Sequence, residues 1–119
     1  MTEMESWRRI AQCEREYKKL PPIAQAGLTE VVGRLRWGAT RGSDTTKLSG
    51  AIWEIRWRKG NNHYRILYAR DPRGGGYLGL LAAYKNQQKT PKGWIDTAKK
   101  RLAAEETRAK SEQTGNGRP

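Results

Sequence analysis

The spacing of apolar residues changes along the chain, and each change marks a different kind of element. From about Met4 to Lys19, apolar residues recur every three or four positions, as on one face of an α-helix. Pro21-Pro22 ends that helix, and Pro22 is well placed to begin a second one, because proline is favoured in the first helical turn. The second helix runs to about Trp37. The first part of the sequence therefore predicts a helical hairpin.

Between Ala51 and Arg70 the period becomes two, which indicates β-strands. Gly60-Asn61 has the composition of a two-residue hairpin turn. This turn would place Arg56 directly opposite Arg65. Like charges in that position destabilise a sheet, so the pair suggests an anionic ligand. The ordinary alternative is that Arg56 pairs with Glu54, two residues away on the same face.

The same register predicts which side chains form the core. It places the aromatic residues of both strands on one face and the basic residues on the other. The residues expected in the core are Trp53, Trp57, Tyr64, Tyr68 and, from the last helix, Trp94; those expected on the polar face are Arg56, Arg58, His63 and Arg65.

A third strand is expected from Tyr77 to Tyr84, where apolar residues occupy both faces. Thr90-Pro91 is a typical helix start, and apolar spacing continues to Leu102. The tail 111–119 contains nothing that could pack, and we expect it to be disordered. The sequence thus predicts one α+β domain over residues 1–110. It has two N-terminal helices, a sheet of three or four antiparallel strands and a C-terminal helix.

The distribution of charge adds a functional hint. The chain of 119 residues has a formal net charge of +12. Residues 47–101 hold 13 basic and 3 acidic side chains, a net +10, so nearly all the excess lies in the segment with the strands. This concentration of positive charge would attract a polyanion such as nucleic acid. The alternative interpretation is a generally basic surface that keeps the protein soluble. A membrane surface is not favoured, because no helix combines these basic residues with a bulky apolar face.

Several classes of chemistry find no support in the residues present. One His, one Cys and scattered carboxylates offer no spaced set of ligands, so neither a metal nor a cofactor is expected. Ser or Cys catalysis lacks a partner pattern around the single histidine. Cys13 allows no internal disulfide, and no apolar run suits a spanning helix or a signal peptide. A cytoplasmic location is expected.

What remains is a basic strand face with aromatic residues nearby. Guanidinium groups bind phosphate through paired hydrogen bonds, and fixed cations stabilise a phosphorane or lower the pKa of a neighbouring base. Lys85 and Lys89 leave the third strand towards the same region, and Tyr84 is placed to stack on an unpaired base. Each also has an ordinary interpretation: His63 as a solvated turn residue, the lysines as solvent-facing, and Tyr84 as part of the core.

The run KLSGAIWEIRWRKGNNHYRILY, followed by LLAAYKNQQKTP and a basic helix, resembles the phage-derived HigB branch of the RelE/ParE toxin superfamily. The likeness spans about Leu20 to Leu102. It implies a RelE-like fold and a metal-independent endoribonuclease that acts on translated mRNA at the ribosome. It also implies a helix-turn-helix antitoxin as partner.

The resemblance further implies roles for particular residues. In such enzymes, basic side chains on the sheet orient the ribose 2′-hydroxyl for attack on the adjacent phosphate. The residues that match this pattern are Arg56, Arg65, Lys85 and Lys89; His63, on the same predicted face, is a further catalytic candidate, and Arg58, Tyr84 and Lys47 are RNA-binding candidates.

The lysine element departs from the family pattern, because it is one residue shorter and has Asn86 where a second lysine is expected. Two alternatives therefore stay open beside the nuclease. One is a ParE-like inhibitor of DNA gyrase, which shares the fold but performs no cleavage. The other is a non-catalytic basic module of phage origin that binds nucleic acid or protein.

Overall fold

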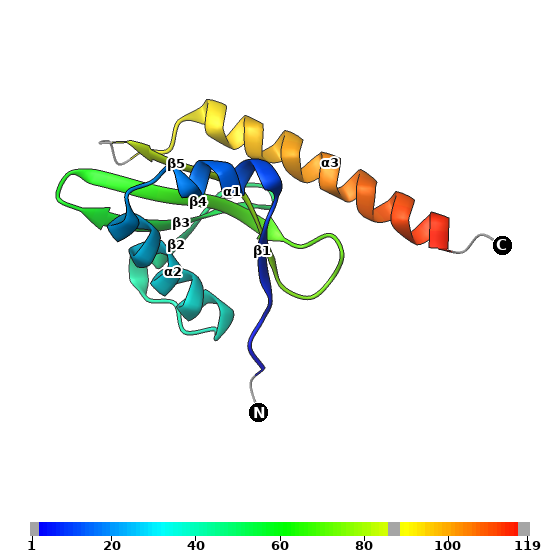
Figure 1. Cartoon of the computed structure of the whole chain (residues 1–119), viewed down its shortest axis with the longest axis horizontal. Coiled ribbons are helices and arrows are strands. Elements are labelled where there is room, and N and C mark those ends of the chain that lie inside the picture. Colours follow the sequence, from blue (N-terminus) through cyan, green and yellow to red (C-terminus); the bar gives the residue numbers. More distant parts are fainter. Residues whose placement is uncertain (1–2, 86–88, 117–119) are drawn as a thin grey trace.

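A computed structural model of the chain describes residues 3–85 and 89–116 and shows an α+β fold (Figure 1). The elements in chain order are β1 (Trp7–Arg9), α1 (Ala11–Lys18), α2 (Pro22–Arg36), a 3₁₀ turn η1 (Gly42–Asp44), β2 (Thr45–Ser49), β3 (Ile52–Lys59), β4 (Asn62–Arg70), β5 (Tyr77–Lys85) and α3 (Lys92–Asn116). Within these residues, the five strands form one sheet in the order β1-β5-β4-β3-β2. The predicted α+β class is confirmed, but the sheet is larger than predicted and mixed, because β1 runs parallel to β5.

The N-terminal residues form an edge strand where the sequence predicts the start of a helix. β1 pairs with β5, and the flanking backbone hydrogen bonds run from the Tyr77 N–H to the Ser6 carbonyl (2.9 Å) and from the Ile10 N–H to the Gly79 carbonyl (3.1 Å). The ring of Trp7 also meets Tyr68 edge-on. The prediction of a helix from Met4 is wrong, because pairing with a distant strand outweighs helical spacing in so short a segment.

Beyond β1, side chains take the place of a strand along the edge of β5. The Ala82 N–H donates to Oε1 of Glu16, in α1, at 3.1 Å. Arg101, in α3, donates to the Leu80 carbonyl at 2.8 Å and to both oxygens of the Glu16 carboxylate at 2.9 and 3.0 Å. Backbone groups that β1 does not reach are thereby satisfied, and α1, α3 and the sheet become one unit.

The β3–β4 hairpin has the predicted register. Arg56 pairs with Arg65, and Trp57 pairs with Tyr64. Gly60 has φ +60°, which suits the glycine-first chemistry of a two-residue hairpin turn. The third predicted strand is also confirmed, as β5. The additional strand β2, which pairs with β3, lies in a segment whose polar composition does not reveal it.

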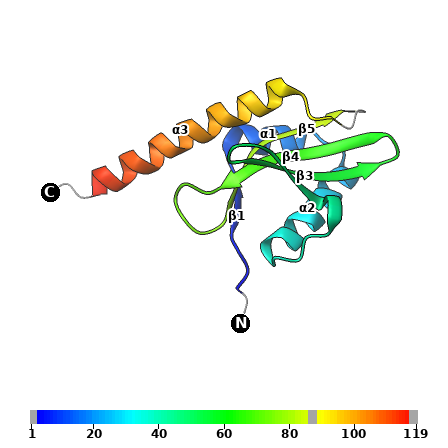
Figure 2. The ribbon, with the colours of Figure 1, turned by 180° about the vertical axis from the view of Figure 1, so that it is seen from behind.

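Helices cover both faces of this sheet. α2 and α3 lie on opposite sides of it in two views (Figures 1 and 2). Consequently β4 is buried from His63 to Ala69, on both of its faces. The expectation of a solvated polar face on this hairpin is therefore wrong over much of its length.

The predicted aromatic core is confirmed only in part. Tyr64 and Tyr68 are buried, and Trp57 and Trp94 are half-buried against the core. Trp53, by contrast, is 39% exposed, because it lies where an open groove replaces helical cover.

α3 begins slightly later and ends later than predicted. It starts at Lys92, and the Thr90 hydroxyl bonds to a buried carboxylate of the sheet. The helix continues to Asn116, where the sequence predicts a disordered tail, and Arg73 from the β4–β5 loop holds Glu112 at 2.5 Å. No helix among the described residues has both the length and the apolarity needed to cross a bilayer.

Two glycines of α2 give a matched test of the packing of this helix on β3. A Cβ at Gly27 would lie within 3.0 Å of the Trp57 ring, whereas a Cβ at Gly33 meets nothing within 4 Å. We expect Gly33→Ala to raise the free energy of unfolding by roughly 0.5–1 kcal/mol, since Ala is the better helix former. Gly27→Ala should lower it by about 1–2 kcal/mol, because the clash outweighs that gain. Urea unfolding measures both, and a stabilised Gly27→Ala would contradict this packing.

Candidate active site

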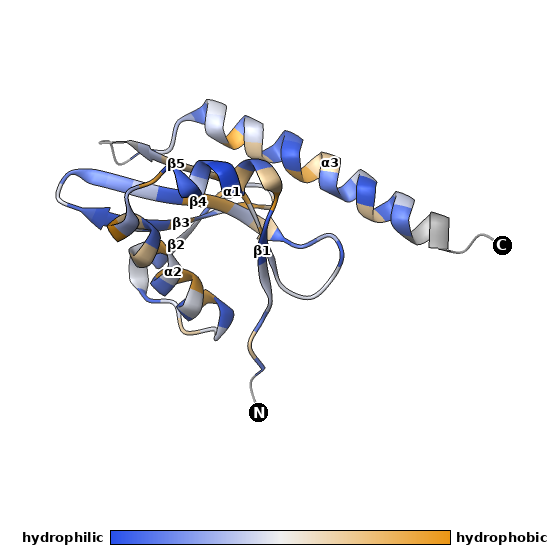
Figure 3. Ribbon diagram, viewed as in Figure 1, coloured by the Kyte–Doolittle hydropathy of each residue, from blue (hydrophilic) through white to orange (hydrophobic). Residues whose placement is uncertain are grey.

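The hairpin brings four of the predicted site residues together on one face of the sheet, near its turn. Arg56 pairs with Arg65 and Arg58 pairs with His63, so all four side chains leave the sheet on the same side. We call these four residues the basic cluster. The surrounding end of the hairpin is hydrophilic (Figure 3). Lys85 pairs with His63 from β5, but its side chain, like residues 86–88, lies outside the described part of the chain.

A buried carboxylate lies against the two arginine side chains at one end of the basic cluster. Oε2 of Glu54 accepts a hydrogen bond from Nη2 of Arg56 at 2.6 Å, and Oε1 lies 3.5 Å from Nε of Arg65. The Thr90 hydroxyl donates to the same Oε1 at 2.5 Å. The pairing of Arg56 with Glu54, which the sequence offered as the ordinary alternative, is confirmed. Glu54 thus compensates two guanidinium groups that would otherwise repel each other across the strands.

Arg65 is fully buried, with an exposed fraction of 0%. The pKa of Arg65 is lowered, mainly by burial; the charge of Glu54 opposes this lowering and the charge of Arg56 adds to it. A guanidinium so far from solvent offers RNA no surface to contact. The predicted bridge of Arg56 and Arg65 across one phosphate is therefore not supported, because helices cover this face as well as the other. Arg65 is placed to position its neighbours.

The accessible part of the site consists of Arg56, Arg58 and Lys89. The Arg56 side chain is 20% exposed, even though one of its nitrogens bonds to Glu54. Arg58 and Lys89 are exposed. Lys89 directly precedes Thr90, whose hydroxyl bonds to Glu54, so the backbone of Lys89 lies beside the basic cluster. These residues can present positive charge to a phosphate group.

His63 is only 7% exposed, so the interpretation as a solvated turn residue is wrong. Its Nδ1 has no hydrogen-bond partner among the described residues. The pKa of His63 is lowered; burial is the largest cause, and the charges of Arg65, Arg56 and Arg58 lower it further. The imidazole is therefore mainly neutral at neutral pH and able to accept a proton.

Two predicted RNA-binding residues lie apart from the basic cluster. Tyr84 pairs with Tyr64 on the opposite face, where the two rings stack with centroids 5.2 Å apart. Tyr84 is exposed, so its interpretation as a core residue is wrong. Lys47, in β2, pairs with Trp53 and shares that opposite face. Neither side chain joins Arg56 in one site.

The described residues offer little for other chemistries. No group of three or more His, Cys, Asp or Glu side chains within residues 3–85 and 89–116 is arranged to hold a metal ion. Burial raises the pKa of the Cys13 thiol to about 12, so this thiol is not a nucleophile at neutral pH. The residues available for chemistry are those of the basic cluster and the neighbouring Lys89.

An α+β fold with a basic cluster on its hairpin is what the resemblance to phage-derived toxins implies. The chain belongs to the family described as Phage derived protein Gp49-like (DUF891), which matches residues 15–103. It is similar to two curated proteins, both named Probable endoribonuclease HigB1, from Mycobacterium tuberculosis strains CDC 1551 / Oshkosh and ATCC 25618 / H37Rv. Each is 41% identical over 85 residues, which make up 71% of this chain and 66% of the relative. The chain thus spans about two thirds of the length of these relatives, and the resemblance to the HigB branch is confirmed.

Glu54 provides a test of the charge balance in the basic cluster. Glu54→Gln removes the carboxylate that faces a fully buried Arg65, and we expect it to lower the free energy of unfolding by about 3–5 kcal/mol. Glu30→Gln is the matched control, because Glu30 is exposed and lies 3.4 Å from Arg34 on the surface of α2. It should cost less than about 1 kcal/mol. Equal losses in urea unfolding would show that Glu54 does not compensate Arg65.

Proposed function

We propose that this protein is the toxin of a type II toxin-antitoxin system and acts as a metal-independent endoribonuclease on translated mRNA. Membership of the Gp49-like family and the likeness to proteins named probable endoribonucleases support this proposal. The observation that carries it is the pairing of a buried, largely neutral imidazole with accessible guanidinium groups on one strand face. These are the groups that transesterification of RNA requires.

In the proposed reaction, the ribose 2′-hydroxyl attacks the adjacent phosphorus. A bond from the 2′-oxygen to phosphorus forms and the bond to the 5′-oxygen breaks, which leaves a 2′,3′-cyclic phosphate and a 5′-hydroxyl. His63 accepts the proton of the attacking hydroxyl. Arg56 and Arg58 stabilise the negative charge of the phosphorane.

The remaining site residues have supporting roles in this proposal. Lys89, and Lys85 at the end of β5, supply positive charge or a proton near the leaving 5′-oxygen. Arg65 acts as a positioning residue, because it fixes Glu54 and, through it, the guanidinium of Arg56. Arg56 is then held in place before RNA binds, which reduces the entropy lost in the transition state.

The alternatives from the sequence are less well supported. An inhibitor of DNA gyrase or a non-catalytic module would have no use for a buried imidazole next to accessible arginines, and the similar proteins are named as probable endoribonucleases. The same likeness supports a cognate antitoxin as partner, and we include it in the proposal.

Cleavage is tested with purified protein in an in vitro translation reaction, with primer extension to map the cuts. The wild-type protein should cut mRNA, and Arg56→Ala should slow cleavage about 10²-fold or more, because a transition-state cation is lost. Arg15→Ala, which removes an exposed arginine of α1, is the control and should cleave normally. Arg65→Ala is a poor probe, because Arg65 is buried and its loss threatens folding. If expression of the protein in cells arrests growth while transcripts stay intact, the nuclease proposal is rejected and inhibition of DNA gyrase is favoured.

The pH dependence of cleavage tests the role of His63. Because the pKa of His63 lies below its ordinary value, the rate should be constant at neutral pH and fall only as the pH decreases through that lowered pKa. His63→Gln should reduce the rate and remove this acidic limb. Protonation of His63 also opposes folding in the same range, so circular dichroism at each pH must show folded protein. An acidic limb that persists in His63→Gln would assign the base to another residue.

A further inference from the structure

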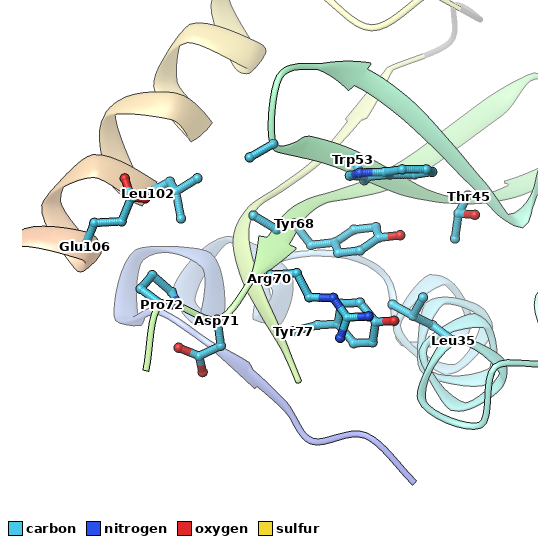
Figure 4. A pocket seen from close by; sticks show the side chains of 12 residues that line it. Leu35, Thr45, Trp53, Tyr68, Arg70, Asp71, Pro72, Tyr77, Leu102 and Glu106 are labelled. Carbon is cyan, nitrogen blue, oxygen red and sulfur yellow. The ribbon is translucent and has the colours of Figure 1, made fainter. Parts of the chain in front are cut away.

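A second concave surface lies at the other end of the hairpin, where β3 begins and β4 ends. It is a groove of about 530 Å³ that runs across the end of the sheet, from Leu35 in α2 to Leu102 in α3 (Figure 4). Trp53 and Tyr68 are paired across the two strands and lie side by side on its α2 side. The basic cluster is near the opposite, turn end of the same strands. The groove is therefore a separate surface from the proposed active site.

The residue types in this groove are those that dominate the energetics of protein interfaces. Trp53 leaves 39% of its surface exposed, beside the buried ring of Tyr68. Tyr68 meets Tyr77 edge-on at 5.7 Å, and the guanidinium of Arg70 lies 4.3 Å from the centre of the Tyr77 ring. Trp, Tyr and Arg are the residues most enriched in binding hot spots. Because the tyrosine rings are already fixed by their neighbours, little side-chain entropy would be lost when a partner binds to them.

The charges around the groove favour a polypeptide over RNA. The exposed carboxylate of Glu106 lines it together with Arg70. Asp71 lines it too, but its side chain is largely buried and paired with Arg8. The carboxylate beside the basic cluster, that of Glu54, is fully buried. Arg70 is the one cation among the described residues that line the groove, and Glu5 already pairs with it, so a phosphate backbone would find no row of cations here. A polypeptide segment can instead combine a large apolar side chain with a single carboxylate, which suits an aromatic floor and one arginine.

The chain's own N-terminal segment shows how a carboxylate is held at this site. Glu5 forms an ion pair with Arg70, whose side chain is still 66% exposed. The Glu5 N–H donates to the Arg36 carbonyl, and Nε of Arg36 donates back to the Glu5 carbonyl, both at 2.8 Å. Surface ion pairs of this kind are weak, so an incoming carboxylate can replace Glu5.

Exposed apolar side chains adjoin this network. Met4 precedes Glu5, and Trp37 follows Arg36, and both side chains are exposed. Trp53, in the groove itself, is also exposed. Large exposed apolar side chains with a polar rim are typical of interaction sites on a protein surface.

We propose that this groove is the docking site for a segment of the antitoxin. One large apolar side chain of that segment packs on Trp53 and Tyr68, and a neighbouring carboxylate binds Arg70. The inference rests on the proposed toxin function, since it names the surface that the partner of that toxin uses. It also places the partner away from the basic cluster, so that docking does not depend on Arg56 or Arg58.

The test measures binding and cleavage separately. The product of the reading frame beside the toxin gene is purified and titrated calorimetrically into wild-type protein, Trp53→Ala and Arg70→Glu. Each of these two variants should weaken binding about tenfold or more, as expected for hot-spot residues, and should still cleave mRNA as the wild type does. The matched controls are Ile23→Ala, an exposed apolar residue of α2, and Arg15→Glu, an exposed arginine of α1; both should bind normally. Thermal unfolding confirms that the variants are folded.

The outcomes separate this inference from the proposed function. Normal binding by both Trp53→Ala and Arg70→Glu, or no binding by the wild type, overturns the docking site. Normal binding together with weaker RNA cleavage by Trp53→Ala also overturns it and makes the groove an RNA subsite. If the wild type cleaves no RNA but binds through Trp53 and Arg70, the nuclease proposal fails while the docking site stands.

Discussion

One carboxylate allows two guanidinium groups to face each other inside this protein. Glu54 faces both guanidinium groups, and the loss of one partner from a buried ion pair costs several kcal/mol. The same carboxylate receives the Thr90 hydroxyl, which ties the segment before α3 to the hairpin. Arg56, which reaches solvent, is thus held by Glu54, which is fully buried. The orientation of the proposed site therefore depends on interactions that RNA never touches.

The hairpin was predictable because its determinants are local. Gly60-Asn61 specifies the turn, the alternation of side chains specifies the faces, and together they place Arg56 opposite Arg65. β1 was not predictable, since its three consecutive residues lie in a stretch with helical spacing and form a strand only because the distant edge of β5 is available. The burial of Arg65 was missed for a related reason. A pattern along one strand shows which residues share a face, but it does not show what covers that face.

Among the candidate site residues, those that depend on local register were also predicted more successfully than those that depend on distant segments. His63 and Arg58 could be placed beside the arginines from register alone, and the structure keeps them there. Tyr84 and Lys47 were named as RNA-binding candidates, but each pairs with an aromatic residue on the opposite face. The parity of strand positions could have separated Tyr84, which alternates with Lys85, from the basic cluster; Lys47 lies in β2, which the sequence does not reveal. The groove around Trp53 left no such signal, because it is formed by residues far apart in the sequence, from Leu35 to Glu106.

The link between Glu16 and Arg101 spans 85 positions in the sequence. A chain that emerges from the ribosome in order has its five strands before it has α3, and until then the Leu80 and Ala82 edge of β5 lacks the hydrogen bonds that Arg101 supplies. Closing so long a loop comes late in folding. Maturation of this protein therefore waits for its last helix, and a polypeptide released before Arg101 would carry the strands of the site without the support that holds them together.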